Sequence, residues 1–440
     1  MQFPEALAYL LSLGHETLTI KLGLENTESL LVALRNPQRQ FPAVQIAGTN
    51  GKGSTAAFLD SICRASGIRV GLFTSPHLVS ITERIQIDGQ QISEDQFALF
   101  TRAVKETAEE LVARGKLQTL PTFFEQITAI ALLAFREARV ELAILETGLG
   151  GRLDSTTAAR AEIVAITSIA MDHQEYLGTT LREIAAEKAA IIRQGVTAII
   201  APQDETAFEV IIRRCESVAV QPRLIGSQYR EQCQTGCGKS TPDGRCLVSF
   251  DIDSSIQCEV TVALRGRHQS VNALTAIALA EAAREHGFQI PPESIVRGIE
   301  TTQHPGRLEI WDGSPRFLFD GAHNPAAARA LRNFLDEFVK ERIVMIFGAM
   351  QDKALDEMTA VLFSRADKVI LTTLDNPRAA SVEALVAALP EGFDQAGVLR
   401  ASSVDEALQL ARMVTPAGGL VCVTGSLYLV GAAQAALRSR

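Results

Sequence analysis

Short apolar runs alternate with longer amphipathic stretches over the first two-thirds of the chain. Five runs have the length and β-branched content of buried strands, at 43–47, 70–73, 142–146, 163–168 and 197–201. Apolar residues recur at helical spacing between and after them, at 55–66, 94–114, 123–138, 181–192, 270–286 and 294–300. This alternation predicts a mostly parallel sheet covered by helices on both faces.

A second alternating series follows the polar segment 301–306, which contains Pro and Gly and is typical of a linker. Strands are predicted at 317–320, 343–347, 368–372 and 420–424, and helices at 326–339, 355–363, 381–388 and 404–414. The series predicts a smaller, Rossmann-like doubly wound domain. We therefore expect an α/β protein of two domains, residues 1–302 and residues 303–440.

Net charge and hydropathy limit the kinds of molecule that the protein is expected to bind. The 440 residues carry a formal net charge of −9, which argues against a nucleic-acid surface. No uninterrupted apolar stretch reaches membrane-spanning length, and residues 1–5 do not begin a signal peptide. The seven cysteines, an odd number, fit reduced thiols. We expect a cytoplasmic monomer that acts on small-molecule substrates, with no nucleic-acid partner and no membrane contact.

Four of the cysteines cluster between residues 228 and 258. Cys233, Cys237, Cys246 and Cys258 lack the paired C-x-x-C spacing that marks many zinc sites. A loop-rich insertion with strands at 246–252 and 257–264 is the favoured interpretation over a zinc site. The sequence does not indicate what this insertion does.

A glycine-rich turn after the first strand carries the strongest chemical signal. It reads Gly48-Thr49-Asn50-Gly51-Lys52-Gly53-Ser54. Backbone N–H groups at a helix N-terminus bind phosphate oxygens, Lys52 would supply a cation, and Ser54 or Thr55 would supply a hydroxyl for a metal. The spacing departs from the G-x-x-x-x-G-K-[ST] pattern, and a tight strand–helix connection is the alternative. The strand–loop–helix context favours a nucleotide site.

Polar side chains follow several predicted strands, where ligand sites of open α/β sheets form. Ser75 follows the second strand, Glu146 closes the third, and Asp172 and His173 come soon after the fourth. Asp320 closes the first strand of the second series. Hydroxyl, carboxylate and imidazole groups at neighbouring strand ends indicate Mg²⁺ ligands. Taken singly, Glu146 fits a loop carboxylate and His173 a hydrogen-bonded histidine, so their common position carries the prediction.

Three further residues fit structural roles as well as functional ones. Lys188 lies on an amphipathic helix, where a lysine is normally a solvated surface residue. Asn272 fits a helix N-terminal cap, and Arg307 fits a salt bridge at the hinge. The residues alone therefore predict a two-domain, magnesium-dependent, ATP-using enzyme with its site in the cleft between the domains.

Six blocks of the chain together resemble the folylpolyglutamate synthase/dihydrofolate synthase family of the Mur ligase superfamily. They lie at 48–54, 74–78 with 83–85, 146–154, 168–173 with 187–189, 268–269 with 272, and 304–307 with 320–325. The resemblance implies a P-loop-type Mur ligase central domain and a Rossmann-like glutamate ligase domain. It implies an ATP-dependent amide ligase that adds L-glutamate to folates, and in a bifunctional enzyme also to dihydropteroate, through an acyl phosphate.

The resemblance also implies which residues hold the nucleotide and the metal. ATP would be held by Gly48, Thr49, Asn50, Gly51, Lys52, Gly53, Ser54, Asn272, Arg307 and Asp320. Two Mg²⁺ ions would be held with Ser75, Glu146 and His173. Lys188 matches a lysine that is carbamylated in this family, which would turn a cation into an anion that helps to position a metal.

The remaining matches concern the two substrates that are joined. Lys52, Lys188 and His323 are expected to serve the reaction itself, and the incoming glutamate would lie near His323 and Ser426. The pterin side would lie near Phe124, Glu125, Asp154 and Ser155.

One departure and two rival functions stay open. Thr157 stands where the family usually has asparagine. A Mur-type ligase for another carboxylate acceptor would carry a UDP-sugar-binding domain before the phosphate turn, and the 47 residues before Gly48 are too few for one. A non-catalytic nucleotide-binding regulator would lack a metal ligand or Lys52, and none is missing.

Overall fold

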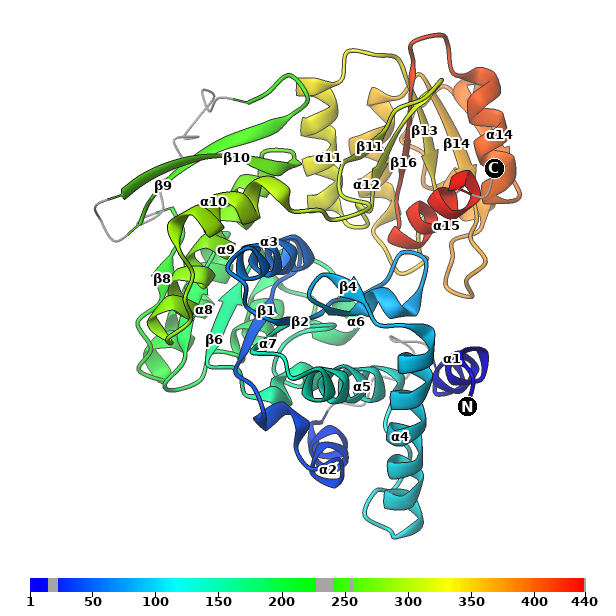
Figure 1. Cartoon of the computed structure of the whole chain (residues 1–440). Coiled ribbons are helices and arrows are strands. Elements are labelled where there is room, and N and C mark those ends of the chain that lie inside the picture. The colour runs from blue at the N-terminus through cyan, green and yellow to red at the C-terminus, as the bar shows by residue number, and fades with distance from the viewer. Residues whose placement is uncertain (15–22, 227–239, 253–255, 439–440) are drawn as a thin grey trace.

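The computed structural model describes residues 1–14, 23–226, 240–252 and 256–438. It contains an eight-stranded sheet, a six-stranded sheet and a two-stranded hairpin. We call the part of the chain built on the eight-stranded sheet the large lobe, and the part built on the six-stranded sheet the small lobe (Figure 1).

The sheet of the large lobe has the strand order β4-β3-β2-β5-β1-β6-β7-β8. Its strands are β1 (Ala43–Ala47), β2 (Val70–Phe73), β3 (Ile85–Ile87), β4 (Gln90–Gln91), β5 (Leu142–Glu146), β6 (Ile163–Ile166), β7 (Thr197–Ile200) and β8 (Arg223–Leu224). All are parallel except β3 and β4, which form an antiparallel edge. Because β1 lies between β5 and β6, the turn that follows β1 leaves the sheet near its centre.

Helices cover both faces of this sheet, since alternate side chains of each strand belong to different cores. Val44 and Ile46 of β1 face one core, while Ala43 and Ala47 face the other. The first face is covered by α3 (Lys52–Ala65), α9 (His268–Glu285) and α10 (Pro292–Thr301). The second carries α1 (Phe3–Ser12), α2 (Glu25–Ala33), α4 (Glu94–Ala113), α5 (Phe123–Ala138), α6 (Gln174–Leu177), α7 (Leu181–Ala189) and α8 (Glu205–Ser217).

The small lobe repeats this layered arrangement on the sheet β11-β12-β16-β13-β14-β15. Its strands are β11 (Glu309–Trp311), β12 (Arg316–Asp320), β13 (Ile343–Phe347), β14 (Lys368–Thr372), β15 (Val398–Ala401) and β16 (Leu420–Thr424), and only β11 is antiparallel. One face carries α11 (Pro325–Phe338), α12 (Leu355–Leu362) and α13 (Val382–Ala387). The other carries α14 (Val404–Val414) and α15 (Leu427–Arg438), so the predicted doubly wound arrangement is confirmed.

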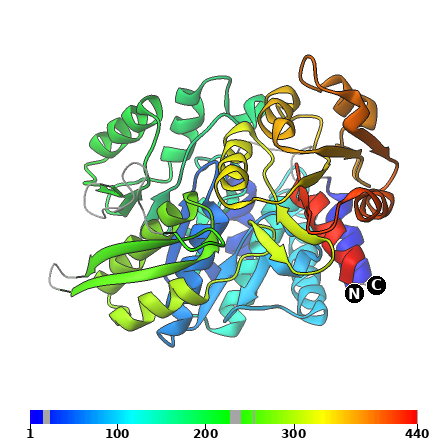
Figure 2. The ribbon, with the colours of Figure 1, turned by 90° about the horizontal axis from the view of Figure 1, so that it is seen from above.

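The cysteine-containing insertion forms a hairpin of β9 (Arg245–Ile252) and β10 (Ile256–Arg265). It packs on α9 and α10 and projects from the large lobe (Figure 2). The two strands predicted here are confirmed. Cys246 and Cys258 are free thiols, whereas Cys233 and Cys237 lie outside the described residues, so the zinc alternative is not decided there.

Most predicted elements are confirmed to within two residues, and the larger deviations have local causes. The helix predicted from residue 55 begins at Lys52, because Gly51 ends the turn in a left-handed conformation (φ 89°). The helix predicted over 181–192 ends at Ala189. The linker prediction was one residue too long, since Thr301 still belongs to α10. Among the described residues, no helix combines the length and apolar character needed to span a bilayer.

Candidate active site

The glycine-rich turn of residues 48–54 joins β1 to α3 at the centre of the large sheet. A Cβ at Gly51 would collide with the Asn272 side chain, which approaches from α9. The Thr49 N–H donates to the Ser168 carbonyl at 2.8 Å, which ties the turn to the segment after β6. The turn is thus held in shape by its neighbours, and glycine is required where Asn272 approaches.

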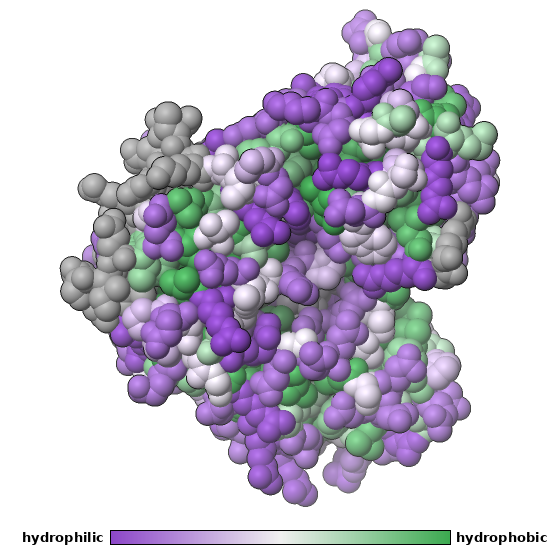
Figure 3. Space-filling view, turned by 45° about the horizontal axis from the view of Figure 1, so that its top comes forward, coloured by the Kyte–Doolittle hydropathy of each residue, from purple (hydrophilic) through white to green (hydrophobic). Residues whose placement is uncertain are grey.

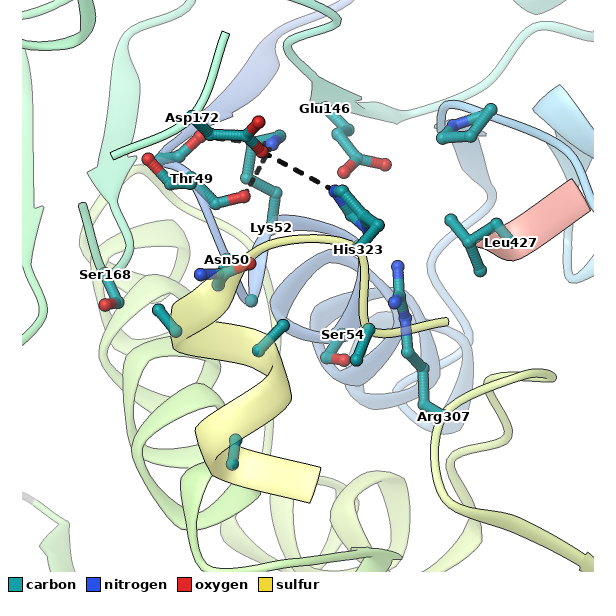
Figure 4. Close-up of a pocket in the computed structure, with 18 of the residues that line it drawn as sticks. Thr49, Asn50, Lys52, Ser54, Glu146, Ser168, Asp172, Arg307, His323 and Leu427 are labelled. Carbon is teal, nitrogen blue, oxygen red and sulfur yellow. Dashed lines mark hydrogen bonds and ion pairs between the residues drawn. The ribbon is translucent and has the colours of Figure 1, made fainter. Parts of the chain in front are cut away.

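A cavity of about 420 Å³ lies against this turn, between the two lobes (Figures 3 and 4). Its lining brings together most of the predicted site residues: residues 48–54, Ser75, Glu146, His173, Lys188, Asn272, Arg307, Asp320, His323 and Ser426. The large lobe contributes the turn and the strand-end groups, and the small lobe contributes the last four. Nucleotide-sized sites of this kind commonly form at the carboxyl ends of parallel strands.

Two lysines share one backbone acceptor beside the cavity. Lys52 Nζ donates to the Gly48 and Thr49 carbonyls at 3.1 and 3.3 Å, and Lys188 Nζ donates to the Gly48 carbonyl at 2.9 Å. Lys188 is buried, which contradicts its interpretation as a solvated surface residue. Burial, together with the nearby Lys52 charge, lowers the pKa of Lys188 to about 7. Burial thus favours the uncharged, nucleophilic form of the Lys188 amine.

The three predicted metal ligands come from neighbouring strand ends. Glu146 is buried at the end of β5, and its Oε2 accepts the Ser75 N–H at 3.0 Å. His173 lies after β6 with φ 50°, and burial lowers the pKa of its imidazole to about 3, so the ring is neutral and can offer a lone pair. No cluster of three or more His, Cys, Asp or Glu side chains arranged for a metal occurs in the described ranges.

The donor set nevertheless suits a divalent cation that keeps part of its water. A Cβ at Gly53 would lie 3.4 Å from Glu146 Oε2 and 3.0 Å from His304 Nε2, so the absence of a side chain leaves room beside the carboxylate. Mg²⁺ usually takes few protein oxygens and completes its shell with water and phosphate. Ser75, Glu146 and His173 all line this cavity, and as a donor set they fit such an ion.

On the small-lobe side of the cavity, Asp320 ends β12 as a buried carboxylate. Its oxygens accept the Leu308 and Ala322 N–H groups, each at 3.0 Å. Burial raises the pKa of Asp320 to about 6, against the opposing effect of Arg307. No salt bridge of Arg307 is found within the described part of the chain, and its charge acts on the buried Asp320. It lines the cavity instead, where its charge is available to an anionic ligand.

His323 and Ser426 complete the predicted residues of the small lobe. His323 Nδ1 lies 2.8 Å from the Gly321 carbonyl, and burial lowers the pKa of its imidazole to about 4. Ser426 is buried, and its Oγ accepts the Tyr428 N–H at 3.2 Å. Both reach the same cavity as the glycine-rich turn.

Asn272 does not cap α9, because the helix begins four residues earlier, at His268. Its amide donates to Gln269 Oε1 at 2.9 Å, next to Gly51. The capping interpretation is therefore wrong, and Asn272 contributes a buried amide to the cavity wall.

The four predicted pterin-side residues form a separate cluster, which does not line this cavity in the described structure. Asp154 Oδ2 accepts the Gly148 and Leu149 N–H groups at 2.8 and 2.9 Å. The Phe124 ring packs against Gly148, where a Cβ would collide with it. Glu125 Oε1 and Ser155 Oγ both lie within reach of the Thr27 hydroxyl, at 3.4 and 3.3 Å.

Thr157, the one departure from the family pattern, forms hydrogen bonds with neighbouring residues. Thr157 Oγ1 donates to the Gly151 carbonyl at 2.7 Å and accepts Gln45 Nε2 at 2.8 Å. The hydroxyl thus holds the same loop that Asp154 binds from its other side.

Sequence reasoning missed several cavity residues, above all Lys353. Its ammonium lies 2.6 Å from Asp172 Oδ1, and both side chains are almost fully buried. His304 belongs to one of the blocks that carry the family resemblance but was given no role. It lies outside this cavity's lining, its Nε2 is buried without a hydrogen-bond partner, and burial lowers its pKa to about 3. Lys353 follows β13, so the strand-end rule could have found it. No local signal marks His304.

Comparison with known proteins agrees with this geometry. The model of the Mur ligase middle domain matches residues 46–280, and that of the Mur ligase, glutamate ligase domain, matches residues 306–427. A protein named dihydrofolate synthase/folylpolyglutamate synthase from Bacillus subtilis is 33% identical over 93% of this chain and 94% of its own length. The chain spans about half the length of two archaeal relatives that it also matches.

Solved structures extend the likeness to the whole fold. The Mycobacterium tuberculosis folylpolyglutamate synthase complexed with ADP matches with a TM-score of 0.90 and 32% identity, over 99% of each chain. A bifunctional folylpolyglutamate synthase/dihydrofolate synthase from Yersinia pestis, complexed with AMPPNP and Mn ion, matches with a TM-score of 0.83 and 29% identity, over 100% of this chain and 98% of its own. The chain therefore belongs to the Mur ligase family, in its folylpolyglutamate synthase/dihydrofolate synthase branch.

Proposed function

We propose that this protein uses ATP to join L-glutamate to the terminal carboxylate of folates, and that it also joins glutamate to dihydropteroate. One observation carries the proposal. A single cavity is lined by the phosphate-binding turn and Lys188 of the large lobe, and by Arg307, Asp320 and His323 of the small lobe. The names of full-length relatives supply the chemical class of the acceptor and the two activities.

The proposed reaction has two steps. The acceptor carboxylate attacks the γ-phosphorus of ATP, which gives an acyl phosphate and releases ADP. The glutamate amine then attacks the acyl carbon, the tetrahedral intermediate collapses, phosphate leaves, and an amide remains. A free carboxylate is a poor acylating agent in water, so the phosphoryl group supplies the leaving group.

The cavity residues lower the barrier chiefly by electrostatics. Lys52 offsets the repulsion between the attacking carboxylate and the phosphates, and the N–H groups at the start of α3 bind phosphate oxygens. Arg307 supplies a second cation from the small lobe. Burial keeps the imidazole of His323 neutral, so one of its ring nitrogens has a lone pair for the proton that the glutamate amine loses. Burial between the lobes excludes water from the acyl phosphate.

Divalent cations would be held by Ser75, Glu146 and His173, and would screen the phosphate charge during phosphoryl transfer. Two such ions are proposed, together with a carbamate on Lys188. An uncharged lysine amine adds to CO₂ and loses a proton, and the buried, partly neutral Lys188 beside the Gly48 carbonyl suits that addition. The carbamate oxygens would then face the cavity that Lys188 lines.

We further propose that Asn272, Arg307 and Asp320 contact the nucleoside part of ATP, and that His323 and Ser426 receive the incoming glutamate. The pterin would lie against Phe124, with Glu125, Asp154 and Ser155 around it. We place the two functional domains at residues 1–302 and 303–440, and each family model matches a segment within one of them. The working form is a cytoplasmic monomer.

The decisive experiment measures ADP release by the purified protein with ATP, Mg²⁺ and L-glutamate. Dihydropteroate and tetrahydrofolate are compared as acceptors, and each product is confirmed by a mass gain of one glutamate. Turnover with both acceptors supports the full proposal, and turnover with tetrahydrofolate alone removes the dihydropteroate part. Silence with both acceptors, alongside intact ATP binding, contradicts the proposal and favours another carboxylate acceptor or a regulator.

A further inference from the structure

A buried polar cluster crosses the boundary between the lobes next to the cavity. Asp172 belongs to the large lobe, and its Oδ1 lies 2.6 Å from Lys353 Nζ of the small lobe. Asp172 Oδ2 accepts the Asn324 amide at 3.1 Å, and His323 Nε2 lies 3.7 Å away. Three groups of the small lobe therefore converge on one carboxylate of the large lobe (Figure 4 shows Asp172 and His323 facing each other).

The same cluster reaches the phosphate-binding turn. Asn324 Nδ2 donates to Asn50 Oδ1 at 3.0 Å, and Asn50 Nδ2 donates back to Asn324 Oδ1 at 3.3 Å. Asn324 is also the N-cap of α11, where its Oδ1 accepts the Ala327 N–H at 2.9 Å. The Asn324 side chain therefore has a fixed direction. Its contacts with Asn50 hold the small lobe in one position against the phosphate-binding turn.

Asp172 in turn holds the backbone of His173. The His173 N–H donates to Asp172 Oδ1 at 2.9 Å, the same oxygen that pairs with Lys353. His173 has φ 50° and ψ 40°, a left-handed conformation that residues with side chains rarely adopt unless their surroundings impose it. This conformation starts α6 at Gln174 and places His173 in the cavity lining.

We propose that Lys353 is a positioning residue, which fixes Asp172 and through it the conformation that directs the His173 imidazole into the cavity. The metal-holding set of the large lobe is then complete only when the small lobe is docked, so that the phosphate-activating site forms together with the glutamate-receiving one. The assignment of His173 as a metal holder rests on the proposed function; the contacts that fix it do not.

The test compares Mn²⁺ binding with nucleotide binding. Free Mn²⁺ is followed by electron paramagnetic resonance as the ion is titrated into protein with a non-hydrolysable ATP analogue, and affinity for the analogue is measured separately in EDTA. Lys353→Met should weaken Mn²⁺ binding by at least about tenfold, as is usual when support for a metal ligand is removed. Affinity for the metal-free analogue should change by less than about threefold, and Lys353→Arg should recover part of the Mn²⁺ affinity.

Glu337→Gln is the matched control. It removes a different ion pair between the lobes, that of Arg267 and Glu337 at 2.5 Å, which is half-exposed and does not involve Asp172. This variant should keep wild-type Mn²⁺ affinity. Equal losses in the control and in Lys353→Met, or wild-type Mn²⁺ affinity in Lys353→Met, would overturn the proposal, as would the lack of a Mn²⁺ site in the wild type.

Thermal unfolding checks that each variant is folded, and Lys353→Gln replaces Lys353→Met if the latter is not. Glutamate ligation by the wild type is assayed independently. If ligation is absent while the Mn²⁺ pattern holds, the proposed function fails and the positioning role of Lys353 stands.

Discussion

Replacing Lys188 by methionine should make the protein more stable and at the same time inactive. Methionine has nearly the length of lysine but no charge to bury. The Gly48 carbonyl, which accepts from Lys188 at 2.9 Å, keeps a second donor in Lys52 at 3.1 Å. The substitution therefore removes a buried ammonium without leaving an unpaired acceptor, and it also removes the amine that the proposed carbamate needs.

The structure gives the size of the effect. Lowering the pKa of Lys188 from 10.5 to about 7 corresponds to a folding cost of about 5 kcal/mol below pH 7. The lost hydrogen bond and packing contacts offset about 2 kcal/mol of that relief, so Lys188→Met should gain about 3 kcal/mol at pH 6. Between pH 7 and 10.5 the unfolded chain binds more protons at Lys188 than the folded protein does. Wild-type stability therefore rises with pH in this window. Near pH 9.5 the remaining cost of the buried charge is about 1.4 kcal/mol, less than the lost contacts contribute, so the variant's advantage disappears.

The assay is urea unfolding at pH 6 and pH 9.5 in CO₂-depleted buffers, so that no carbamate forms on the wild type. ADP release with dihydropteroate or tetrahydrofolate is measured in parallel. A variant less stable than the wild type at pH 6, or an advantage that does not change with pH, would refute the burial argument. A stable variant with normal turnover would refute the role of Lys188 in the reaction.

Three further predictions follow from the same contacts. Lys52→Ala should lower ADP release by at least about a thousandfold, because removing a preorganised cation from phosphoryl transfer has effects of this order; near-normal turnover would contradict the nucleotide assignment. Gly431→Ala should lower turnover while leaving each lobe folded. Its Cβ would collide with the Leu78 carbonyl, at the contact between α15 of the small lobe and the loop after β2 of the large lobe. Gly397→Ala is the control and should behave as wild type, because its Cβ meets nothing closer than 3.6 Å. The nucleotide affinity of the wild type should fall as the pH drops through about 6, where Asp320 gains a proton. The Asp320→Asn variant should bind the nucleotide weakly at both pH values. Equilibrium titrations at pH 5.5 and 7.5 measure both affinities.

Strands buried on both faces were the elements that sequence patterns predicted best. β1, β2, β5, β13, β14 and β16 have the predicted bounds, because continuous apolar runs leave the chain few alternatives. The edge strands were missed. β8 and β11 are two and three residues long, and β15 is half-exposed and interrupted by Arg400, so their pairing is decided by the sheet rather than by the strand.

Within the site, the sequence predicted correctly those polar residues that close a buried strand. Glu146 and Asp320 were found because each closes a buried strand. The burial of Lys188 could not be read from α7, since the helix is amphipathic and its buried side is covered by loops distant in sequence. The pairing of Lys353 with Asp172 joins residues 181 positions apart across two lobes. His304 lies beside Gly53, a contact between distant segments that no local pattern encodes.

The cavity gathers cations and uncharged imidazoles in a way that suits a polyanion and little else. Lys52, Lys188 and Arg307 line the cavity together with the carboxylates Glu146, Asp172 and Asp320. The buried histidines stay neutral because desolvation outweighs the effect of their neighbours. Such an arrangement is costly without a ligand, as the lowered pKa of Lys188 shows. A triphosphate offsets the charges of Lys52 and Arg307, and the proposed carbamate removes the positive charge of Lys188. The chain needs both lobes to produce this site, because residues of both lobes line the cavity.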